Sequence, residues 1–417
     1  MTKNDPYSQA VNSGMYRREK GIRRKYDNVR IFWEDEIIRI FLKPYIENRL
    51  HSQKKKGKKL RILDLGCGSG DGYELFREMN KSNTGILESK IKLLDDDSLG
   101  LYKGIENNKD LLAQNRERWG EKSKMICSWG DFSQGLPLKE KEKPYDIYFA
   151  SYGVMSHIND DQTVQLFSDI IRHAENGSII MGDWLGRYSY EWQELWNDNT
   201  RKEQWMDYYI SYIYPPEKRK NLKLTPLKLR LMSRDEIMNL VKRIEKNMGE
   251  QLEVEEIYDR SLFVGRHMDT NDYNKYLHPL RNQVNLLFER GSRTDLQKLK
   301  LNYHHHTAIR SQNKYFEEFS SVWNALIDYT VQLLKELDRK EESTNIKYKE
   351  QYPDNIHFLF ENMKCIIKNI DCFQMDDVRA DCIEPQLGYC LRDLEMSLQQ
   401  GQGNGHGLTG IFSIKKH

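Results

Sequence analysis

Four glycines recur at every second position in one short stretch of the sequence, and this spacing could serve ligand binding. They are Gly66, Gly68, Gly70 and Gly72, and they directly follow the apolar run Leu60–Leu65. Glycine permits backbone conformations and close approaches that a Cβ atom would block. A parallel strand that turns into a helix at such a loop presents backbone N–H groups to a ligand. The stretch therefore predicts a ligand held against this backbone.

Two common ligands of glycine-rich loops, dinucleotides and nucleoside triphosphates, fit this stretch poorly. The dinucleotide pattern G-x-G-x-x-G, counted from Gly66, has Asp71 in place of its third glycine. A triphosphate-binding loop would end in Gly-Lys-Ser or Gly-Lys-Thr, which the stretch lacks, and no basic residue lies within the loop to meet a phosphate. A nicotinamide-dependent oxidoreductase is therefore disfavoured, and a tight turn that binds no ligand is the other alternative.

The order of four motifs instead resembles that of class I S-adenosylmethionine-dependent methyltransferases. The segment Asp64–Gly70 reads D-L-G-C-G-S-G, the form of that family's cofactor loop. The family's acidic residue at the end of the second strand corresponds to Glu106, and a Gly-Asp-Phe sequence at Gly130–Phe132 follows the third strand. Tyr145–Ser151 reads as the fourth strand, which opens on the reacting side. The resemblance covers residues 60–183 and implies S-adenosylmethionine as the cofactor of a methyl transfer.

The resemblance also implies which residues contact the cofactor. The bare glycines would admit its amino-acid end, and Asp64 would order the loop or meet the ammonium group. Glu106 would accept hydrogen bonds from both ribose hydroxyls, and Asp131 would meet the adenine amino group. The cofactor-binding residues expected in this way are Asp64, Gly66, Cys67, Gly68, Gly70, Glu106, Asn107, Asp131, Phe132 and Ser151.

One spacing departs from the family pattern. Glu106 follows Asp64 by 42 positions, about twice the ~20 residues usual in nucleotide-binding units. Residues 80–98 therefore read as an insertion in the first crossover. Glu88 lies nearer the expected distance, but Glu106 ends a longer strand-like run and precedes a predicted helix. We expect Glu106 to hold the ribose, with Glu88 as the alternative.

The catalytic machinery expected of a methyltransferase is small. Methyl transfer is an in-line displacement on an activated sulfonium, so the protein mainly positions the acceptor and excludes water. A base helps when the acceptor is a hydroxyl or a protonated amine. His157 follows the fourth strand and is the candidate base, because an imidazole titrates near neutral pH. Its alternative role is to cap or pack near the helix start at Asn159.

An aromatic-rich stretch, Trp184–Pro216, follows the expected fifth strand, where the family often builds a substrate lid. Its rings could stack on a flat acceptor or enclose a cation, or they could form core between the lid and the helical region. The substrate-contacting residues expected are Tyr152, Trp184, Tyr188 and Trp192.

Neither the histidine cluster nor the cysteines predict a metal site. Successive residues of a helix face different directions, so His304, His305 and His306 cannot ligate one metal from a regular helix. The six cysteines include no C-x-x-C pair and read as free thiols. We expect the three histidines on the surface or in the substrate pocket, and no metal.

Short apolar strands alternate with helical segments between residues 60 and 183, a pattern that predicts β-α units and a parallel sheet. Strands are expected at Leu60–Leu65, Leu99–Glu106, Lys124–Cys127, Tyr145–Ser151, Ser178–Asp183, Leu252–Ile257 and Ser261–Arg266. Helices are expected at 29–50, Gly72–Met79, Asn108–Trp119, Asp160–His173 and Ser233–Met248, the last with a capping box from Ser233 to Glu236. Ligands of such a sheet lie at the carboxyl ends of its strands, where the motifs fall.

The expected fold class is α/β, a Rossmann-like seven-stranded methyltransferase sheet with an N-terminal helical lid and a mainly helical C-terminal region. Residues 1–59 would form the helical cap and a linker. Residues 60–268 would form the cofactor-binding domain, with an aromatic lid insertion at 184–232. Residues 269–417 would form the helical region with its Gly-rich tail.

Composition limits the partners of the protein. The 417 residues include 65 basic and 63 acidic side chains, so a net charge of +2 offers no overall field for nucleic acid. No apolar run reaches the about 18 residues of a membrane helix, and the polar start predicts no signal peptide. We expect a cytoplasmic enzyme that methylates oxygen or nitrogen of a small-molecule acceptor. The alternatives are a protein or peptide acceptor, or an inactive cofactor-binding interaction module.

Overall fold

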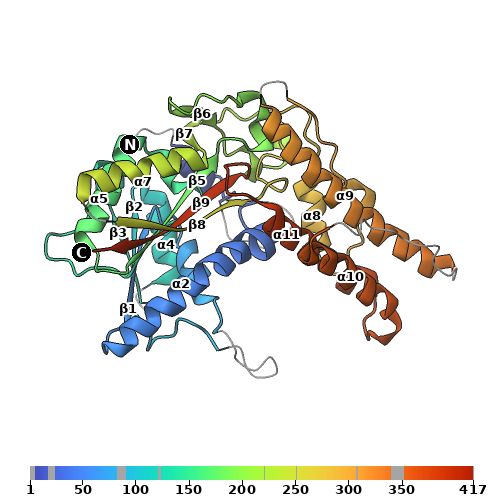
Figure 1. Cartoon of the computed structure of the whole chain (residues 1–417), viewed down its shortest axis with the longest axis horizontal. Helices are drawn as coiled ribbons and strands as arrows, with labels where there is room; N and C mark the ends of the chain where they lie inside the picture. Colours follow the sequence, from blue (N-terminus) through green and yellow to red (C-terminus); the bar gives the residue numbers. More distant parts are fainter. Residues whose placement is uncertain are drawn as a thin grey trace.

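The computed structural model describes residues 5–16, 24–81, 91–120, 124–219, 221–249, 251–306, 309–339 and 352–416. These residues form one mixed sheet, helices that cover it and a helical arm at one side (Figure 1). The strands are β1 (Leu60–Leu65), β2 (Leu99–Glu106), β3 (Met125–Trp129), β4 (Ile147–Ala150), β5 (Ile179–Gly186), β6 (Gln204–Tyr208), β7 (Leu227–Met232), β8 (Gln251–Arg260) and β9 (Gly407–Lys415). The helices are α1 (Pro6–Asn12), α2 (Asp35–Lys55), α3 (Asp71–Arg77), α4 (Lys109–Trp119), α5 (Asp160–His173), α6 (Pro216–Arg219), α7 (Arg234–Met248), α8 (Leu280–Leu287), α9 (Arg310–Arg339), α10 (Asp354–Lys368) and α11 (Glu384–Leu398).

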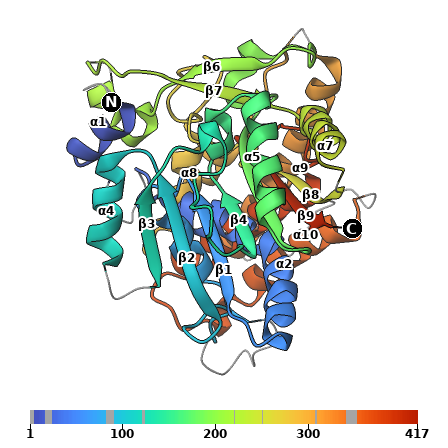
Figure 2. The same ribbon diagram turned by 90° about the vertical axis from the view of Figure 1, so that its left-hand side faces the viewer.

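The described strands form one nine-stranded sheet, in which seven follow in the order β3-β2-β1-β4-β5-β9-β8 and the pair β7-β6 joins the end of β5. Figure 2 shows β3, β2, β1 and β4 side by side. Strands β1 to β5 are parallel, whereas β9 runs antiparallel to both of its neighbours, β5 and β8. A dinucleotide-binding sheet of order 3-2-1-4-5-6 has no reversed strand beside its fifth. The expected α/β class with a Rossmann-like seven-stranded sheet is confirmed.

Alternation along β1 explains how both faces of the sheet become buried. Ile62 and Leu63 are neighbours in a strand, so their side chains point to opposite faces. Ile62 joins a hydrophobic core that includes residues of α2 and α3, whereas Leu63 joins a second core with residues of α5 and α7. Helix α5 begins and ends at the expected residues, and the expected capping box between Ser233 and Glu236 starts α7. These helices fix the strand ends that carry the motifs.

The last strand of the sheet comes from the end of the chain. In β9, Gly410 lies opposite Gly182 of β5. Helices α8 to α11 are therefore inserted between β8 and β9, although the sequence analysis grouped the tail with the helical region. From Gly407 to Ile414 every residue of β9 is buried. A strand buried on both faces lacks the alternation that would tie it to a sheet.

The segment Ser261–Arg266, expected as a strand, leaves the sheet after β8 ends at Arg260. Ser261 adopts a φ of 61°, and the N–H groups of Ser261 and Leu262 donate to the Glu395 carboxylate of α11 at 2.8 and 2.9 Å. A side chain that is distant in the sequence thus replaces the strand partner. No local pattern in the sequence could reveal this acceptor.

Two further elements extend beyond the expected pattern. The helix expected at 29–50 continues to Lys55 and so includes part of the lysine-rich run read as a linker. The region expected as an aromatic lid contains β6 and β7, which pair with each other in antiparallel orientation. Strand β7 also pairs with the end of β5, so this region extends the sheet.

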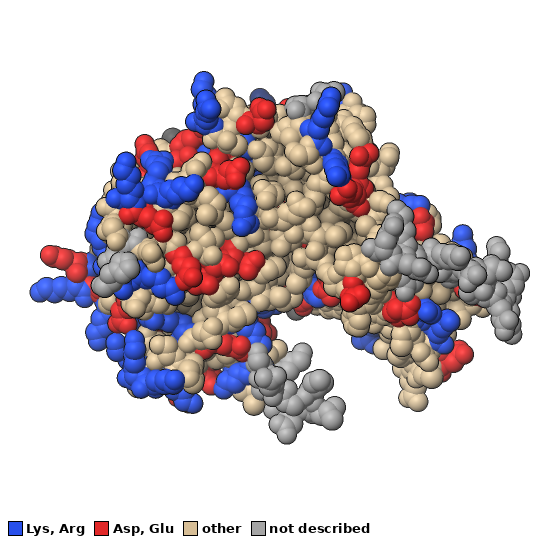
Figure 3. Space-filling model, viewed as in Figure 1, with Lys and Arg blue, Asp and Glu red and all other residues tan. Residues whose placement is uncertain are grey.

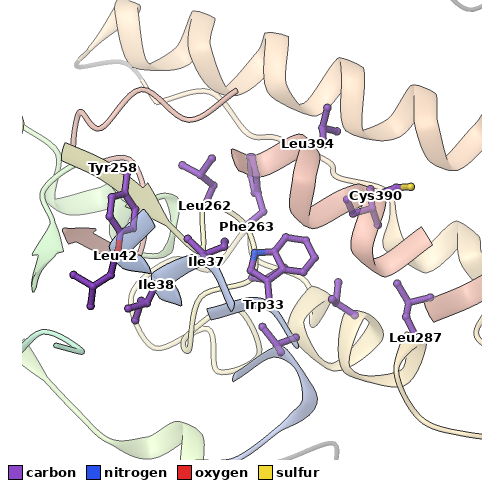
Figure 4. Close-up of a cluster of buried hydrophobic side chains, with 14 of the residues drawn as sticks. Trp33, Ile37, Ile38, Leu42, Tyr258, Leu262, Phe263, Leu287, Cys390 and Leu394 are labelled. Atoms are coloured by element: carbon purple, nitrogen blue, oxygen red, sulfur yellow. The ribbon is translucent and has the colours of Figure 1, made fainter. Parts of the chain in front are cut away.

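The helical arm and the sheet share one hydrophobic core. Trp33, just before α2, packs in a cluster with side chains of the arm such as Leu287 and Leu394 (Figure 4). Its Nε1 donates to Glu395 Oε1 at 3.0 Å. The same cluster contains Ile62 of β1. The arm is therefore attached to the body through buried apolar side chains as well as through hydrogen bonds.

Basic and acidic side chains are interspersed on the face shown in Figure 3, in keeping with the net charge of +2. Across the described ranges, every helix is too short or too polar to span a bilayer. Within the same part of the chain, no cluster of three or more histidine, cysteine or acidic side chains could hold a metal ion.

Candidate active site

A cavity of about 530 Å³ lies where β1, β2 and β4 end. Of the residues expected from the sequence, its lining includes Asp64, Gly66, Cys67, Glu106, Asn107, Phe132, Ser151, Tyr152 and His157. The other expected residues, which lie outside the lining, are Gly68, Gly70, Asp131, Trp184, Tyr188 and Trp192. One cavity therefore joins the glycine loop, the acidic residue of β2 and the candidate base.

The glycine loop turns its backbone toward this cavity. Gly66 has a φ of 66°, in the left-handed region, and a Cβ there would lie 2.8 Å from the Val154 side chain. Gly68 has a φ of 53°, and a Cβ there would meet no atom within 4 Å. The Gly68 N–H donates to Glu106 Oε2 at 2.9 Å and so ties the loop to the end of β2. Glycine is thus required at position 66 for close packing, and position 68 borders open space.

Glu106 is a buried carboxylate that retains capacity for a ligand. Its Oε2 accepts the Gly68 N–H, and its Oε1 accepts the Asn108 N–H at 2.8 Å. Burial raises the pKa of Glu106, and these backbone donors oppose the rise. A carboxylate has about four lone-pair positions, so each oxygen can accept one more hydrogen bond. This geometry fits two neighbouring hydroxyls of a ribose; the alternative residue, Glu88, lies outside the described residues.

Asp64 lies beneath the loop at the end of β1. Its Oδ2 accepts the Tyr102 hydroxyl at 2.6 Å. Burial raises the pKa of Asp64 to about 8, and the nearby carboxylates of Asp71 and Glu106 add to the rise. Because a nearby cation favours the charged form of a carboxyl, an ammonium group in the cavity would ionise Asp64.

Asp71, which stands where a dinucleotide pattern needs glycine, binds two cations from elsewhere in the chain. Lys25 Nζ lies 2.6 Å from Asp71 Oδ2, and Arg118 Nη1 lies 2.7 Å from Asp71 Oδ1. Burial alone would raise the pKa of Asp71, but Lys25, Arg30 and Arg118 hold it well below its usual range. Asp71 thus engages the cations that could otherwise meet a phosphate at this loop.

The N-terminal segment covers the cavity, a role that the sequence analysis assigned to no individual residue there. Asp5 Oδ2 accepts a hydrogen bond from Asn108 Nδ2 at 2.6 Å, which places α1 against α4 (Figure 2). Tyr7 and Tyr16 line the cavity. Isolated tyrosines in a polar segment show no periodic pattern, so only the long-range contact to Asn108 reveals them. The aromatic wall of the cavity is therefore partly N-terminal.

His157 lies in the short 3₁₀ segment Val154–His157 after β4. Its Nε2 lies 3.4 Å from the Tyr7 hydroxyl. The side chain keeps accessible surface where it faces the cavity, yet the surrounding protein lowers the pKa of His157 to about 4. The imidazole is therefore neutral at physiological pH and is a weak base.

Tyr152 lines the cavity, and its ring contacts two guanidinium groups that also line it. Arg30 Cζ lies 3.2 Å and Arg260 Cζ 4.8 Å from the centre of the tyrosine ring. The Tyr152 hydroxyl donates to Asp35. Tyr152 also has a φ of 58°, which is strained for a residue with a bulky side chain. Such strain persists only where the surroundings fix it, and it concentrates at functional sites.

The arginines around Tyr152 belong to a buried ion-pair network. Arg260 Nη2 lies 3.1 Å from Asp183 Oδ2, and Arg266 Nη2 lies 2.9 Å from Glu34 Oε2. Both arginines line the cavity, as does Glu34. The sequence predicted no role for these side chains, because the carboxylate partners of Arg260 and Arg266 lie more than 70 positions away. The network therefore fixes the positions of side chains that line the cavity.

Three aromatic residues expected to contact substrate pack in the core instead. Trp184 packs near Phe167, and the Trp192 Nε1 donates to the Gly186 carbonyl at 2.8 Å. Tyr188 is partly buried against the core that includes α2. These positions agree with the alternative in which rings of the aromatic stretch form part of the hydrophobic core. From the same stretch, Tyr208 and Tyr212 line the cavity.

Asp131 and the histidine cluster lie at the surface. The exposed Asp131 accepts the Ser133 N–H at 2.9 Å and so begins a 3₁₀ turn. His304 stacks on Tyr276, with ring centres 3.6 Å apart. His305 Nε2 lies 2.7 Å from Glu317 Oε1. These histidines lie in an irregular segment and not in a helix.

Comparison with known proteins finds similarity at the level of solved structures alone. No protein-family model and no curated protein sequence matches the chain. An S-adenosylmethionine-dependent methyltransferase from Mesorhizobium loti is 15% identical, with a TM-score of 0.30 over 48% of this chain and 76% of its own. The glycopeptide N-methyltransferase MtfA, in complex with S-adenosylmethionine, is 14% identical, with a TM-score of 0.32 over 51% of this chain and 86% of its own.

A third solved structure is the CcbJ methyltransferase from Streptomyces caelestis, which is 14% identical, with a TM-score of 0.32 over 48% of this chain and 74% of its own. At these identities, function must be argued from the site itself. All three similar structures are methyltransferases. One is described as dependent on S-adenosylmethionine, and another was solved in complex with it.

Proposed function

We propose that the protein transfers a methyl group from S-adenosylmethionine to oxygen or nitrogen of a small-molecule acceptor. One observation carries the proposal: a single cavity joins the glycine loop after β1 with the carboxylate that ends β2. The reversed strand β9 and the cation-engaged Asp71 argue against a nicotinamide cofactor at this site.

The residues that would hold the cofactor act through different groups. The backbone at Gly66 and Gly68 would meet the amino-acid end, with Asp64 beneath it, and Glu106 would accept the ribose hydroxyls. When bound, S-adenosylmethionine supplies an already activated methyl group. Ser151, directly after β4, also lines the cavity. The protein then has to align the acceptor and exclude water, which can supply about 7–11 kcal/mol of the barrier reduction.

The shape of the site favours a small acceptor over a peptide. A cavity of about 530 Å³ lies within the range of ligand pockets, and Tyr7 and Tyr16 cover it. Peptide-binding proteins instead offer an open groove or a free strand edge. The side of the cavity away from the glycine loop would receive the acceptor, beside Tyr152, Tyr208 and Tyr212.

Calorimetric titration with S-adenosylmethionine tests the proposal. We expect the wild-type protein to bind and Glu106→Ala to lose at least about tenfold in affinity, because a charged acceptor of hydrogen bonds contributes about 1.5–3 kcal/mol. Glu117→Ala, at an exposed position of α4, is the matched control and should bind as the wild type does.

Two results would count against this function. Wild-type protein that binds NADH but not S-adenosylmethionine would support an oxidoreductase. Protein that binds neither would favour the interaction module, in which the glycines only form a turn.

A further inference from the structure

A carboxylate–imidazole pair lies at the end of β5, two strands away from β1 and its glycine loop. His406, directly before β9, lines the cavity. Its Nδ1 lies 2.5 Å from Glu191 Oε2, and its Nε2 lies 3.5 Å from the Tyr208 hydroxyl. An ionised carboxylate can only accept a hydrogen bond, so Nδ1 carries the proton. Nε2 is therefore an acceptor beside the cavity, and the Tyr208 hydroxyl approaches it only at the long distance of 3.5 Å.

The Gly-rich loop before β9 is built around this imidazole. The Asp259 carboxylate accepts the N–H groups of residues 402, 403, 404 and 405 at 2.9, 2.9, 2.8 and 3.2 Å. The His406 N–H donates to the Ser261 carbonyl at 3.0 Å, and its own carbonyl accepts the Gly186 N–H at 3.2 Å. Bonds on both sides of His406 thus fix its backbone. The loop positions one side chain with little freedom.

Glu191 is equally fixed. It is fully buried in the 3₁₀ segment Tyr190–Leu195, where it accepts the backbone N–H of His267 as well as the His406 ring. Burial alone would raise the pKa of Glu191, but His406 and His267 hold it below its usual range. Burying a carboxylate is costly unless it is paired. The pairing here orients the His406 ring.

We propose that His406 is the base of the methyl transfer, with Glu191 as its positioning residue. This inference rests on the proposed function. As the bond forms between the acceptor oxygen or nitrogen and the methyl carbon, the carbon–sulfur bond breaks and its electron pair stays on sulfur. The proton leaves the acceptor atom for His406 Nε2. The sulfonium becomes a neutral thioether, and the imidazolium charge is stabilised by Glu191.

The two histidines of the cavity differ in ways that favour His406. His157 faces the Tyr7 hydroxyl, and although its side chain is exposed to the cavity, desolvation by the surrounding protein lowers its pKa to about 4. His406 has a carboxylate partner that would stabilise its protonated form. His406 also stands beside Tyr208, on the side of the cavity where the acceptor would bind, whereas His157 contacts the N-terminal segment near the cofactor side.

Several titratable groups lie near His406. They are Glu191, Tyr208 on β6, Arg260 on β8, and His267, whose ring centre is 6.4 Å from that of His406. His267 is paired with Asp272, at 3.5 Å, and burial lowers its pKa. Glu191 is thus the carboxylate in direct contact with the His406 ring.

The first test needs neither cofactor nor acceptor. Proteins with nitrogen-15 in the histidine rings are titrated by NMR, with His406→Gln used to assign the signal. We expect the Nδ1–H tautomer of His406 in the wild-type protein. Glu191→Gln should move the titration midpoint of His406 to lower pH, because an adjacent carboxylate favours the imidazolium. Asp272→Asn, which removes a carboxylate from the neighbouring His267, is the matched control and should leave that midpoint unchanged.

The second test measures initial rates with S-adenosylmethionine that carries a tritiated methyl group and a panel of phenols, alcohols and amines. His406→Gln should lower kcat by about 100- to 10,000-fold, with cofactor affinity unchanged. Glu191→Gln should shift the acidic limb of the pH–rate profile with the NMR midpoint.

An Nε2–H tautomer in the wild-type protein would overturn the proposal, and this measurement needs no variant that must fold. An unchanged midpoint in Glu191→Gln would also overturn it, as would full turnover in His406→Gln beside loss in His157→Gln. Failure of the wild-type protein to bind S-adenosylmethionine in calorimetry would instead overturn the proposed function. The two failures are therefore distinguishable.

Discussion

Single side chains determine the chemistry of this cavity through the bonds that hold them. Glu106 is bound by two backbone N–H groups, and Asp64 by the Tyr102 hydroxyl. Both carboxyls have a raised pKa because they are buried. A cationic ligand with neighbouring hydroxyls would be favoured here, since it would restore the charge of Asp64 and use the free lone pairs of Glu106.

Gly68→Arg should abolish cofactor binding and leave the protein folded. A Cβ at Gly68 would meet no atom within 4 Å, and the neighbouring loop residues Gly66 and Cys67 line the cavity, so we expect the long side chain to compete with the ligand for space. We expect a loss of at least about 100-fold in affinity for S-adenosylmethionine, or more than about 2.7 kcal/mol, in calorimetry. Gly57→Arg is the matched control, because Gly57 has a φ of 65° and no neighbour within 4 Å but precedes β1, at the opposite end of that strand from the loop. Equal affinity in both variants would mean that the loop has only a structural role.

Asp64→Asn should change how stability depends on pH. The pKa of Asp64 is raised from 3.8 to about 8, so the folded state holds a proton that the unfolded state has lost between these values. Wild-type stability therefore falls as pH rises from 4 to 8, by at most about 1.4 kcal/mol per pH unit from this group. Asparagine cannot ionise, so in urea unfolding at pH 5 and pH 8 the variant should gain stability relative to the wild type at pH 8. An identical slope in both proteins would contradict a buried, protonated Asp64.

At the level of secondary structure, local pattern predicted the elements whose partners are close in the sequence. Strands β1 and β2 begin and end at the expected residues, and so does α5, because apolar periodicity and caps are local signals. The prediction of a strand at Ser261–Arg266 was wrong, because the N–H groups of Ser261 and Leu262 donate to a carboxylate on α11 and not to a neighbouring strand. The place of β9 beside β5 also depends on a partner far away in the chain, so the tail alone could not reveal it.

Truncation after residue 400 should prevent folding of the whole sheet. It would remove β9, which pairs with both β5 and β8, and would leave both strands with unpaired backbone groups. It would also remove Ile411 from one hydrophobic core and Leu408 and Phe412 from the other, and so expose the side chains that pack against them. We expect loss of the cooperative thermal transition in circular dichroism. Truncation after Lys415, which keeps β9 intact, is the control. A cooperative transition without β9 would show that the tail is dispensable.

For the molecule as a whole, the site combines a predictable part and a part that only the fold assembles. The glycine loop, Glu106 and Ser151 follow successive strands of one sheet, so their meeting at one edge could be anticipated from their order. Tyr7 reaches the cavity through the Asp5–Asn108 contact, and His406 through the return of the chain as β9. Such contacts join residues more than 100 positions apart, and no spacing in the sequence encodes them.

Trp33→Ala should destabilise the arm and the sheet together. Trp33 is fully buried between them, and its Nε1 bonds to Glu395 of α11. Loss of a buried tryptophan costs about 3–5 kcal/mol, and the shared core should spread this cost over both parts. Hydrogen exchange should therefore accelerate by similar factors in peptides from β1 and from α11. Phe358→Ala, at a side chain of α10 that is 67% exposed, is the aromatic control and should change neither. Faster exchange confined to α11 would mean that the arm opens independently. Its contacts could then not hold Ser261, whose carbonyl accepts the His406 N–H, in place.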